Sequence, residues 1–397
     1  MSRPEYKKAV RARVIMLFSM SFQPFQGRYL RVYNQAKALA ARGHDVTLVA
    51  WDRECRYPKE EIFEGIRIIR FWIRAGVGEG PRNGINVARF NWAVLRTLWS
   101  HPFDVLHCFN MDAIVAGLFA AKMRGKKAVL DLCEPEYYGF WDPRFGFLLR
   151  GIRWLEKTLA KRFDHLIVHN AYQVNKFRSY GISHISQVGS YPNRSMLARS
   201  VKAGKGSTIT VGRLGTIYED NGIEELIAAF QRLLDKSSKG PPAVKYKLFL
   251  AGRVYDSYRG TFESLVQSLG KNVEVLGAYR VDDLPRLYRN IDISIMTYRS
   301  KSWFGNVTPT KLFDSLVNGV PVVGNDIGEV GRILKENDCG VIVDERDPDS
   351  ICQGIERLAM DDRLRKRMAE NALKAARERY TWEAVEPVFL EAYQSLE

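Results

Sequence analysis

Short apolar runs rich in β-forming residues alternate along the first half of the chain with longer amphipathic stretches. Helical periodicity is clearest at Tyr29–Arg42, Val87–Trp99, Ala113–Arg124 and Phe147–Arg162. The apolar runs are Val14–Phe22, Asp45–Trp51, Ile66–Ile73, Asp104–Phe109, Ala128–Leu132 and His165–His169. Such alternation is typical of βα units around a parallel sheet. The pattern therefore predicts an α/β domain.

The second half repeats this pattern. Its apolar runs are Thr208–Arg213, Lys247–Gly252, Val273–Gly277, Ile291–Tyr298, Pro321–Asn325 and Gly340–Val343. Between the two sets lies Ser186–Ser207, which is rich in Ser, Gly, Lys and Asn and is typical of a linker. We predict two doubly wound, Rossmann-like parallel-sheet domains, at residues 1–190 and 207–380, joined by a linker at 191–206.

The last segment, Thr381–Leu396, has the pattern of a helix, and Pro387 within it implies a kink. A kinked terminal helix can cross from one domain to the other, so we expect residues 381–397 to return to the first domain. Ligands of open parallel sheets bind beyond the carboxyl ends of the strands. Two such domains are therefore expected to face each other across one cleft lined by loops from both.

Composition narrows the class of protein. The 397 residues are 46% hydrophobic and 12% aromatic, which excludes a disordered chain. The five cysteines are scattered without C-x-x-C spacing, which argues against a disulfide framework and favours a reducing cytoplasm. Val14–Phe22 follows basic residues in the manner of a secretion signal, but it is short and lacks a small-residue cleavage site. No stretch reaches the ~18 apolar residues of a membrane span, so we expect a soluble protein or one lying on a membrane surface.

The positive charge is concentrated in one half. Residues 1–200 carry 32 Lys and Arg against 16 Asp and Glu, a net of +16, whereas residues 201–397 carry 28 against 29, a net of −1. A basic half joined to a neutral half suggests that one domain meets a polyanion, such as an anionic membrane surface or a phosphorylated acceptor. A cationic surface kept for solubility is the alternative reading. A nucleic-acid binder is a third, but no nucleic-acid motif accompanies the charge, so we expect no nucleic-acid partner.

The stretch Asn306–Val323 is the most informative one. It predicts a loop, Pro309 near the first helical position, a short helix from Thr310, Gly319 as its end, and then a buried strand. The N-terminus of a helix has a positive dipole end that suits phosphate oxygens, and Thr308 and Thr310 add hydroxyl donors. Asp314 lies one turn further on, where its carboxylate could accept hydrogen bonds from a vicinal diol such as a ribose. A solvated helix residue is the alternative for Asp314.

Other catalytic patterns do not occur in the sequence. There is no Ser/His/Asp constellation, no H-E-x-x-H, no G-x-x-x-x-G-K-[ST] and no dinucleotide G-x-G-x-x-G. The six histidines are dispersed, so we expect no metal site and no cofactor.

Asn306–Val323 resembles the signature of the retaining glycosyltransferases with the GT-B architecture (glycosyl transferases group 1), in which P-x-K-x-x-E precedes an apolar helix, Gly and P-V-V. The resemblance extends over nearly the whole chain, in an order and spacing that are specific together. The further segments that carry it are Gly27 with Ala41–Val49, Val211–Leu214 with Asn221–Phe230, Leu248–Gly252, Leu276–Gly277 with Leu284–Tyr288, and Thr381–Leu396.

The resemblance implies a nucleotide-sugar held mainly by the second domain and an acceptor held mainly by the first. It implies that Asp314 binds the ribose hydroxyls, in place of a glutamate, and that Arg213 clamps the diphosphate with its guanidinium fork. Asn306 takes the position of another glutamate next to the donor sugar. Asn221 replaces a lysine of the family, and Lys311 is a candidate cation for the diphosphate, with Lys301 the other.

The first domain carries weaker parts of the resemblance. Gly27 lies in the first loop, where a glycine allows a ligand phosphate or sugar to approach the backbone. Arg28 and Arg31 could add positive charge beside this loop. Asp131–Glu134 resembles a D-x-H-E segment, with Cys133 where the family has a histidine. We therefore carry over Glu134 as a donor contact and leave Asp131 open between a functional and a structural role.

From these observations we expect a cytoplasmic enzyme of cell envelope or polysaccharide biosynthesis that can lie on the inner face of the cell membrane as a peripheral protein. It would be a retaining, metal-independent hexosyltransferase that moves a sugar from a UDP-sugar or GDP-sugar to a lipid-linked or polysaccharide-precursor acceptor. Two alternatives stay open: a sugar-nucleotide epimerase, and a non-catalytic nucleotide-sugar-binding or scaffold protein of the same fold. The departures at Asn306, Cys133 and Asn221 favour the second alternative.

Overall fold

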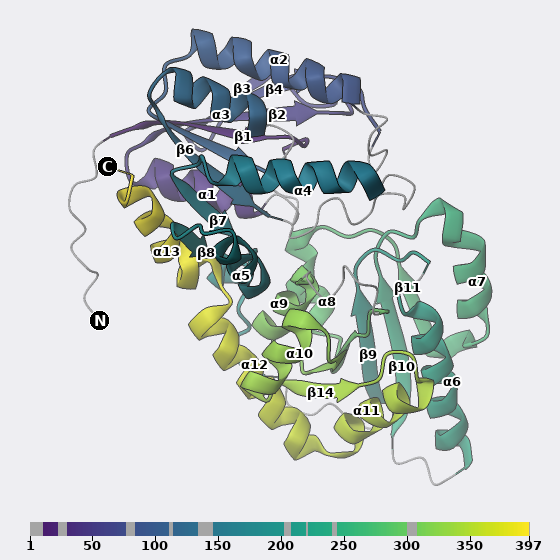
Figure 1. Cartoon of the computed structure of the whole chain (residues 1–397). Coiled ribbons are helices and arrows are strands. Elements are labelled where there is room, and N and C mark those ends of the chain that lie inside the picture. The colour runs from purple at the N-terminus through teal and green to yellow at the C-terminus, as the bar shows by residue number, and fades with distance from the viewer. Residues whose placement is uncertain are drawn as a thin grey trace. The chain divides into compact units, whose positions relative to one another are not determined.

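Each of the two sets of apolar runs forms one sheet in the computed structural model, which describes residues 11–22, 30–76, 84–110, 114–133, 146–201, 208–219, 221–239, 244–299 and 308–396. The chain divides into unit 1, with residues 1–190 and 385–397, and unit 2, with residues 191–384. Each unit has helices on both faces of its sheet (Figure 1). The predicted fold class, two doubly wound α/β domains, is confirmed.

Sheet A, in unit 1, has the strand order β3-β4-β2-β1-β5-β6-β7-β8. Neighbouring strands are parallel except β3, which is antiparallel to β4. The strands are β1 (Arg13–Phe18), β2 (Asp45–Asp52), β3 (Glu60–Phe63), β4 (Ile66–Trp72), β5 (Val105–Phe109), β6 (Lys127–Leu132), β7 (His165–Val168) and β8 (Ile185–Gln187). The two edge strands, β3 and β8, were not predicted, because neither has the continuous apolar run of a buried parallel strand.

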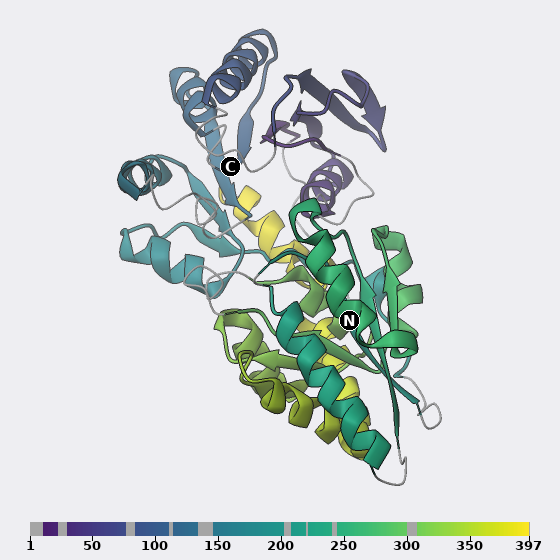
Figure 2. The ribbon, with the colours of Figure 1, turned by 90° about the vertical axis from the view of Figure 1, so that its right-hand side faces the viewer.

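The helices of unit 1 cover both faces of sheet A. They are α1 (Leu30–Ala41), α2 (Gly84–Ser100), α3 (Ile114–Met123), α4 (Gly146–Ala160), α5 (Ala171–Ser179) and α13 (Trp382–Gln394), whose residues from Val385 belong to this unit. Leu106 and Cys108 of β5 share one core with residues of α2 to α5. His107, between them, points to the other face and contacts Tyr393 of α13. Figure 1 and Figure 2 both place α2 and α3 side by side.

Sheet B, in unit 2, is parallel throughout, with the order β11-β10-β9-β12-β13-β14. Its strands are β9 (Thr208–Leu214), β10 (Lys245–Ala251), β11 (Val273–Leu276), β12 (Ile293–Met296), β13 (Val322–Asn325) and β14 (Gly340–Val343). The helices are α6 (Ile223–Lys239), α7 (Arg259–Gln267), α8 (Leu284–Tyr288), α9 (Thr310–Val317), α10 (Gly328–Asn337), α11 (Pro348–Met360) and α12 (Asp362–Arg379), with short 3-10 turns η6 (Arg194–Met196), η7 (Asp256–Tyr258), η8 (Gly270–Asn272) and η9 (Val281–Asp283).

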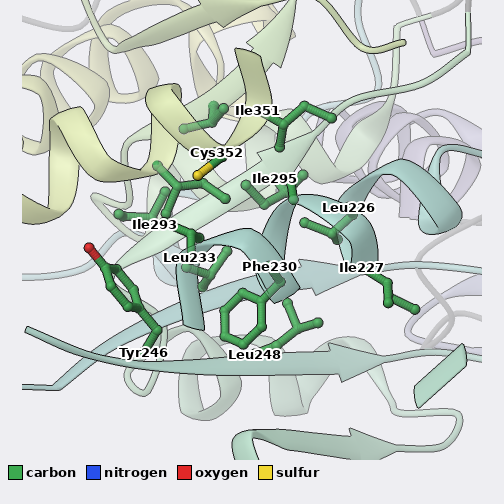
Figure 3. Close-up of a cluster of buried hydrophobic side chains, with 14 of the residues drawn as sticks. Leu226, Ile227, Phe230, Leu233, Tyr246, Leu248, Ile293, Ile295, Ile351 and Cys352 are labelled. Carbon is green, nitrogen blue, oxygen red and sulfur yellow. The ribbon is translucent and has the colours of Figure 1, made fainter. Parts of the chain in front are cut away.

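The core of unit 2 lies on both faces of sheet B. On one face, α6 and α11 pack against the strands through Leu226, Phe230 and Ile351 (Figure 3). On the other face, α9, α10 and α12 share a second core that includes Phe313 and Tyr380. In the part of the chain that the structure describes, no helix combines the length and apolar character needed to cross a membrane.

Residues 191–201, which we predicted to lie in a linker, pack in part into unit 2. The Tyr191 ring centroid lies 4.6 Å from that of Phe313 and 5.5 Å from that of Tyr380. Met196 and Leu197 contact the same core. The polar composition of this segment gives no sign of these three contacts, because their partners lie far away in the chain.

Both sheets reverse their strand order at a defined point. In sheet A the chain adds strands on one side of β1 and then, from β5, on the other, and in sheet B the same reversal lies between β9 and β12. A crevice opens beyond the carboxyl ends of the strands at such switch points, and ligands of doubly wound sheets bind there. A ligand-binding site is therefore expected among the residues that follow β1, β5, β9 and β12.

Candidate functional site

Arg213, near the carboxyl end of β9, spans the switch point of sheet B. Its Nη1 donates a hydrogen bond of 3.2 Å to the carbonyl of Thr297, the first residue after β12. Nη2 donates to the carbonyl of Asn221. The guanidinium carbon lies 5.1 Å from the centre of the Tyr298 ring. These contacts fix the guanidinium across the crevice between the two strand ends.

The charge of Arg213 is buried, and its described neighbours supply no carboxylate partner. The residue is 5% exposed, and within the described ranges no Asp or Glu lies at ion-pair distance from it. Burial lowers the pKa of Arg213, whereas the nearby Tyr298, Tyr218 and Glu224 raise it. An arginine side chain nevertheless stays charged at neutral pH. Two carbonyls and a ring face only partly compensate such a charge, so this edge of the sheet suits an anionic ligand.

The loop between β9 and α6 supports this arrangement. Asn221 Nδ2 donates to the carbonyl of Thr216 at 2.8 Å. Gly222 has φ +80°, and a Cβ on it would lie 2.2 Å from the Thr297 carbonyl oxygen, so only glycine fits at this approach. Asn221, which stands where the resemblance places a lysine, thus contributes a carbonyl acceptor for Arg213 and no charge.

Two buried polar atoms beside Arg213 lack a hydrogen-bond partner among the described residues. They are Asn221 Oδ1 and Thr297 Oγ1. Buried polar atoms are rarely left unpaired, because each costs about 1–3 kcal/mol. Sequence reasoning missed Thr297, although its position as the first polar residue after a buried strand was a usable signal. Either atom could therefore take part in a hydrogen bond to a ligand in this crevice.

The N-terminus of α9 lies in the same unit. Pro309 is the N-cap residue, no side chain caps the helix, and its first turn has no acidic residue. The positive end of the helix dipole is therefore not offset by a carboxylate in that turn. Thr308 is buried and Thr310 is exposed. The structure thus places these two predicted donor contacts at the start of the helix, as the sequence indicated.

Lys311 and Asp314, which we predicted to bind different parts of the donor, form an ion pair with each other. Lys311 Nζ lies 2.9 Å from Asp314 Oδ2 and 5.6 Å from the Tyr279 ring centroid. Burial lowers the pKa of Lys311, but Asp314 and Tyr279 outweigh this and raise it. A Cβ on Gly215, two residues after Arg213, would lie 3.7 Å from Lys311 Cγ. The ion pair therefore lies beside the loop that follows β9.

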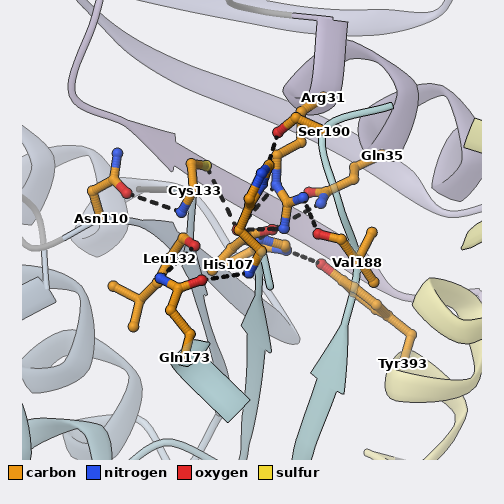
Figure 4. A network of polar contacts seen from close by, with 12 residues as sticks. Arg31, Gln35, His107, Asn110, Leu132, Cys133, Gln173, Val188, Ser190 and Tyr393 are labelled. Atoms are coloured by element: carbon orange, nitrogen blue, oxygen red, sulfur yellow. Dashed lines mark hydrogen bonds and ion pairs between the residues drawn. The ribbon is translucent and has the colours of Figure 1, made fainter. Parts of the chain in front are cut away.

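The carboxyl edge of sheet A holds a second polar cluster, centred on Asp131 near the end of β6. Figure 4 shows Arg31, Gln35 and His107 of this network. Arg31 Nη2 donates to both Asp131 oxygens, at 2.9 and 3.0 Å, and Gln35 Nε2 donates at 2.7 Å. Burial raises the pKa of Asp131, but Arg31, His107 and Gln35 outweigh this and lower it to about 2. Arg31 thus neutralises Asp131 and adds no free charge at the mouth of the loop, contrary to our expectation.

His107 connects this cluster to the last helix. Its Nδ1 lies 2.7 Å from the hydroxyl of Tyr393 in α13, and its Nε2 lies 3.6 Å from Asp131 Oδ2. Burial lowers the pKa of His107, which keeps the ring neutral near pH 7. Cys133, where the family has a histidine, places its Sγ 3.6 Å from Asp131 Oδ1. These side chains hold β5, β6, α1 and α13 together.

Three predicted site residues, Gly27, Glu134 and Asn306, lie outside the described residues, as do Arg28 and Lys301. Within the described residues, no group of three or more His, Cys, Asp or Glu side chains could hold a metal ion.

The Asp131 cluster gives a prediction on stability. Asp131→Asn should lower the free energy of unfolding at pH 7 by about 3–5 kcal/mol, because it leaves Arg31 buried without its counterion. The folded pKa of about 2 is below the usual value, so the contribution of Asp131 is present above about pH 4 and disappears as the pH falls toward 2. The stability difference between parent and variant should shrink in that window. Chemical denaturation at several pH values measures it, with the exposed Asp45→Asn as control, and equal effects of the two substitutions would contradict the assignment.

Comparison with known proteins places each unit in a family. Residues 198–375, in unit 2, match the family described as glycosyl transferases group 1. Residues 28–188, in unit 1, match the glycosyl transferase 4-like domain.

Curated relatives carry related names. An uncharacterized glycosyltransferase from Methanocaldococcus jannaschii is 28% identical over 46% of this chain and 43% of its own length. The capsular polysaccharide biosynthesis glycosyltransferase CapM from Staphylococcus aureus is 25% identical over 45% of each chain. These matches span less than half the length of either relative.

Solved structures agree in fold over the whole chain. Sucrose-phosphate synthase from Thermosynechococcus elongatus has a TM-score of 0.78 at 17% identity, with 97% of this chain and 99% of that chain covered. Anabaena HepE has a TM-score of 0.70 at 16% identity, with 96% and 100% covered. Such neighbours have the GT-B fold. Because the two family matches fall one in each unit of a GT-B fold, this chain belongs to the group 1 glycosyltransferases.

Proposed function

We propose that the protein is a retaining, metal-independent hexosyltransferase that uses a UDP-sugar or GDP-sugar as donor and a lipid-linked or polysaccharide-precursor acceptor. The donor class is supported by neighbours of the same fold: HepE has been crystallised with UDP and glucose, and a trehalose-6-phosphate protein from Escherichia coli with UDP-2-fluoro glucose. The acceptor class is supported by the names of relatives, CapM and the lipopolysaccharide core biosynthesis glycosyltransferase LpsE of Rhizobium meliloti.

The observation that carries this proposal is the buried, uncompensated guanidinium of Arg213. Its contacts to the carbonyls of Thr297 and Asn221 use two of five N–H donors. The remaining donors would bind diphosphate oxygens, and the positive end of α9 would add to the same potential. A departing diphosphate needs fixed positive charge that is already in place when the bond breaks. Arg213 meets this requirement because its neighbours hold it still.

The Lys311–Asp314 pair would serve the nucleotide. Asp314 is 6% exposed and would accept hydrogen bonds from the two ribose hydroxyls. When the ribose occupies Asp314, Lys311 would be released to face the phosphates. The pair thus keeps both charges compensated while the site is empty. Gly27, Thr308, Thr310 and Glu134 stay proposed donor contacts on the strength of the resemblance, and Asn306 a proposed contact of the donor sugar.

The proposed reaction needs no side-chain base. The bond between the anomeric carbon and the diphosphate oxygen breaks, and the acceptor hydroxyl oxygen forms a bond to the same face of that carbon. The acceptor proton moves to the departing diphosphate, whose charge Arg213 and Lys311 stabilise. Retention of configuration follows from attack on the face that the leaving group occupies.

A second candidate is a nucleotide-sugar-binding protein without turnover. The absence of a cation at Asn221, together with the engagement of Lys311 by Asp314, favours it.

We further propose a cytoplasmic location with the basic first half against an anionic membrane surface. The net charge of +16 in residues 1–200 supports this partner.

The purified chain should convert one of a panel of radiolabelled UDP-sugars and GDP-sugars, by slow hydrolysis or by transfer to membrane lipid extracts. Chromatography of the labelled products measures both. Tight binding of a nucleotide-sugar with no conversion would favour the non-catalytic candidate. No binding of any nucleotide-sugar would overturn both.

Arg213→Lys keeps the charge and loses the fork, so it should lower kcat by roughly a hundredfold with a smaller change in KM. The reason is that the charge on the leaving group grows in the transition state. Steady-state kinetics with the nucleotide-sugar that the panel identifies as the donor test this expectation. A raised KM with an unchanged kcat would make Arg213 a ground-state binding residue only.

Asp314→Ala should weaken binding of the free nucleoside diphosphate by about 1.5–3 kcal/mol, the range for hydrogen bonds to a charged group. Asp314→Asn keeps one acceptor oxygen and should lose less. Asp282→Ala, at an exposed aspartate of unit 2, is the control. Calorimetry measures the affinities, and an unchanged value for a folded Asp314→Ala variant would refute the ribose contact.

A further inference from the structure

Three helices of unit 1 expose large apolar side chains on their outer surface. Trp92 and Trp99 of α2, Phe119 and Met123 of α3, and Trp154 of α4 are each between 52% and 67% exposed. We call the outward surface of these helices the α2–α4 face. All three lie on the same side of sheet A, since α2 packs on α3 and α3 on α4.

The exposed side chains follow helical stripes that folding of the unit does not require. In α2 the inward positions Phe90, Val94 and Leu98 are buried in the core. Trp92 and Trp99, seven residues apart, lie on the opposite, solvent side. A surface helix normally presents polar residues there. Packing within unit 1 therefore does not account for the apolar residues on the outer side of α2.

The aromatic side chains surround an open depression between α2 and α3. Its volume is about 570 Å³, and it is lined by Trp92, Leu95, Arg96, Trp99, Ser100 and Phe119. The two helices that form it lie side by side at the surface of unit 1 (Figure 1, Figure 2). The depression lies on the face of sheet A that α2 and α3 cover, whereas the Asp131 cluster lies at the carboxyl edge of the sheet.

The exposed charged side chains of α2 and α4 are positive. Arg89 and Arg96 alternate with the tryptophans along α2, and neither has a carboxylate partner in the part of the chain that the structure describes. Arg150 and Lys157 of α4 are likewise exposed. The only carboxylate in the three helices, Glu156, is 3% exposed and pairs with Lys176 at 2.7 Å. The outward surface thus combines aromatic side chains with uncompensated cations.

We propose that the α2–α4 face docks on an anionic lipid bilayer. Trp92, Trp99 and Phe119 enter the interfacial layer, and the arginines of α2 contact lipid phosphates. Amphipathic aromatic rings prefer the membrane–water interface, and a helix with Trp and Arg on its exposed side matches the pattern of helices that lie in that plane. The arginines of α2, unpaired among the described residues, and the net charge of +16 in residues 1–200 are complementary to an anionic lipid surface.

This inference rests on the proposed function, because a lipid-linked acceptor is the reason for a membrane contact. It goes further because it names the docking surface and assigns the binding free energy to two contributions, one from the aromatic side chains and one from the positive charges. The aromatic contribution should persist at high salt, whereas the electrostatic one is screened over about 10 Å at 0.1 M salt. The two can therefore be separated by variants and by ionic strength.

The test is co-sedimentation of the full chain with phosphatidylcholine vesicles that contain no, or about 30 mol%, phosphatidylglycerol. Binding should rise with the anionic lipid. Trp92→Ala/Trp99→Ala should lower the partition coefficient at least about tenfold at every salt concentration. Arg89→Gln/Arg96→Gln should lower it about thirtyfold at low salt and much less at high salt.

Matched controls separate this face from general effects. Arg363→Gln/Lys366→Gln removes two exposed cations of α12 in unit 2, and Trp72→Ala removes a half-exposed tryptophan of unit 1 outside the face. Both should bind vesicles as the parent does. Circular dichroism verifies that every variant is folded.

Three outcomes would overturn the proposal: equal vesicle binding by parent and face variants, binding that ignores the anionic lipid, or no vesicle binding together with a dimer that the tryptophan variant loses. The last would assign the face to a second copy of the chain. Hydrolysis of the donor without vesicles should be unchanged in the face variants. Vesicle co-sedimentation therefore tests the docking proposal, and hydrolysis of the donor tests the transferase proposal.

Discussion

A charge removed from water must be compensated within the protein, and the two units meet this requirement differently. Arg31 at the edge of sheet A and Arg213 at the edge of sheet B are both buried guanidinium groups. Arg31 has Asp131 as its counterion, at 2.9 Å. Arg213 has carbonyl oxygens and a ring face instead. An isolated buried charge costs several kcal/mol. Loss of Asp131 would therefore destabilise unit 1, whereas the guanidinium of Arg213 in unit 2 keeps a positive charge that suits an anion.

Much of the fold was predictable because parallel strands and their covering helices leave a periodic pattern within each segment. Most predicted strands end within two residues of the observed ones. The strands that were missed, β3 and β8, are short edge strands with half-buried side chains. Tyr191 was assigned to a linker because its neighbours are polar, although the ring packs on Phe313. Local pattern cannot reveal a partner that is distant in the chain.

The same limit applies to the candidate site. Thr308 and Asp314 could be singled out from their positions at the start of a predicted helix, and Arg213 from the resemblance to the family. That Lys311 and Asp314 engage each other, and that Arg31 meets Asp131 a hundred residues away, depends on side-chain geometry. Charge counting likewise located the excess in the first half, but only the structure shows tryptophans exposed among the arginines of α2. In both cases the sequence supplied the residue types and the fold supplied their neighbours.

The network around Asp131 has a consequence for how this chain can diverge. Arg31, Gln35 and His107 all address one carboxylate, and Tyr393 in the last helix completes the set. Loss of any single charge leaves another stranded in the interior, whereas exchange of both Arg31 and Asp131 for apolar residues of similar volume would be tolerated. Substitutions at these two positions are therefore expected to appear together in related sequences. An α13 that lost Tyr393 would in turn relax the constraint on His107, so β5 and α13 are expected to diverge together.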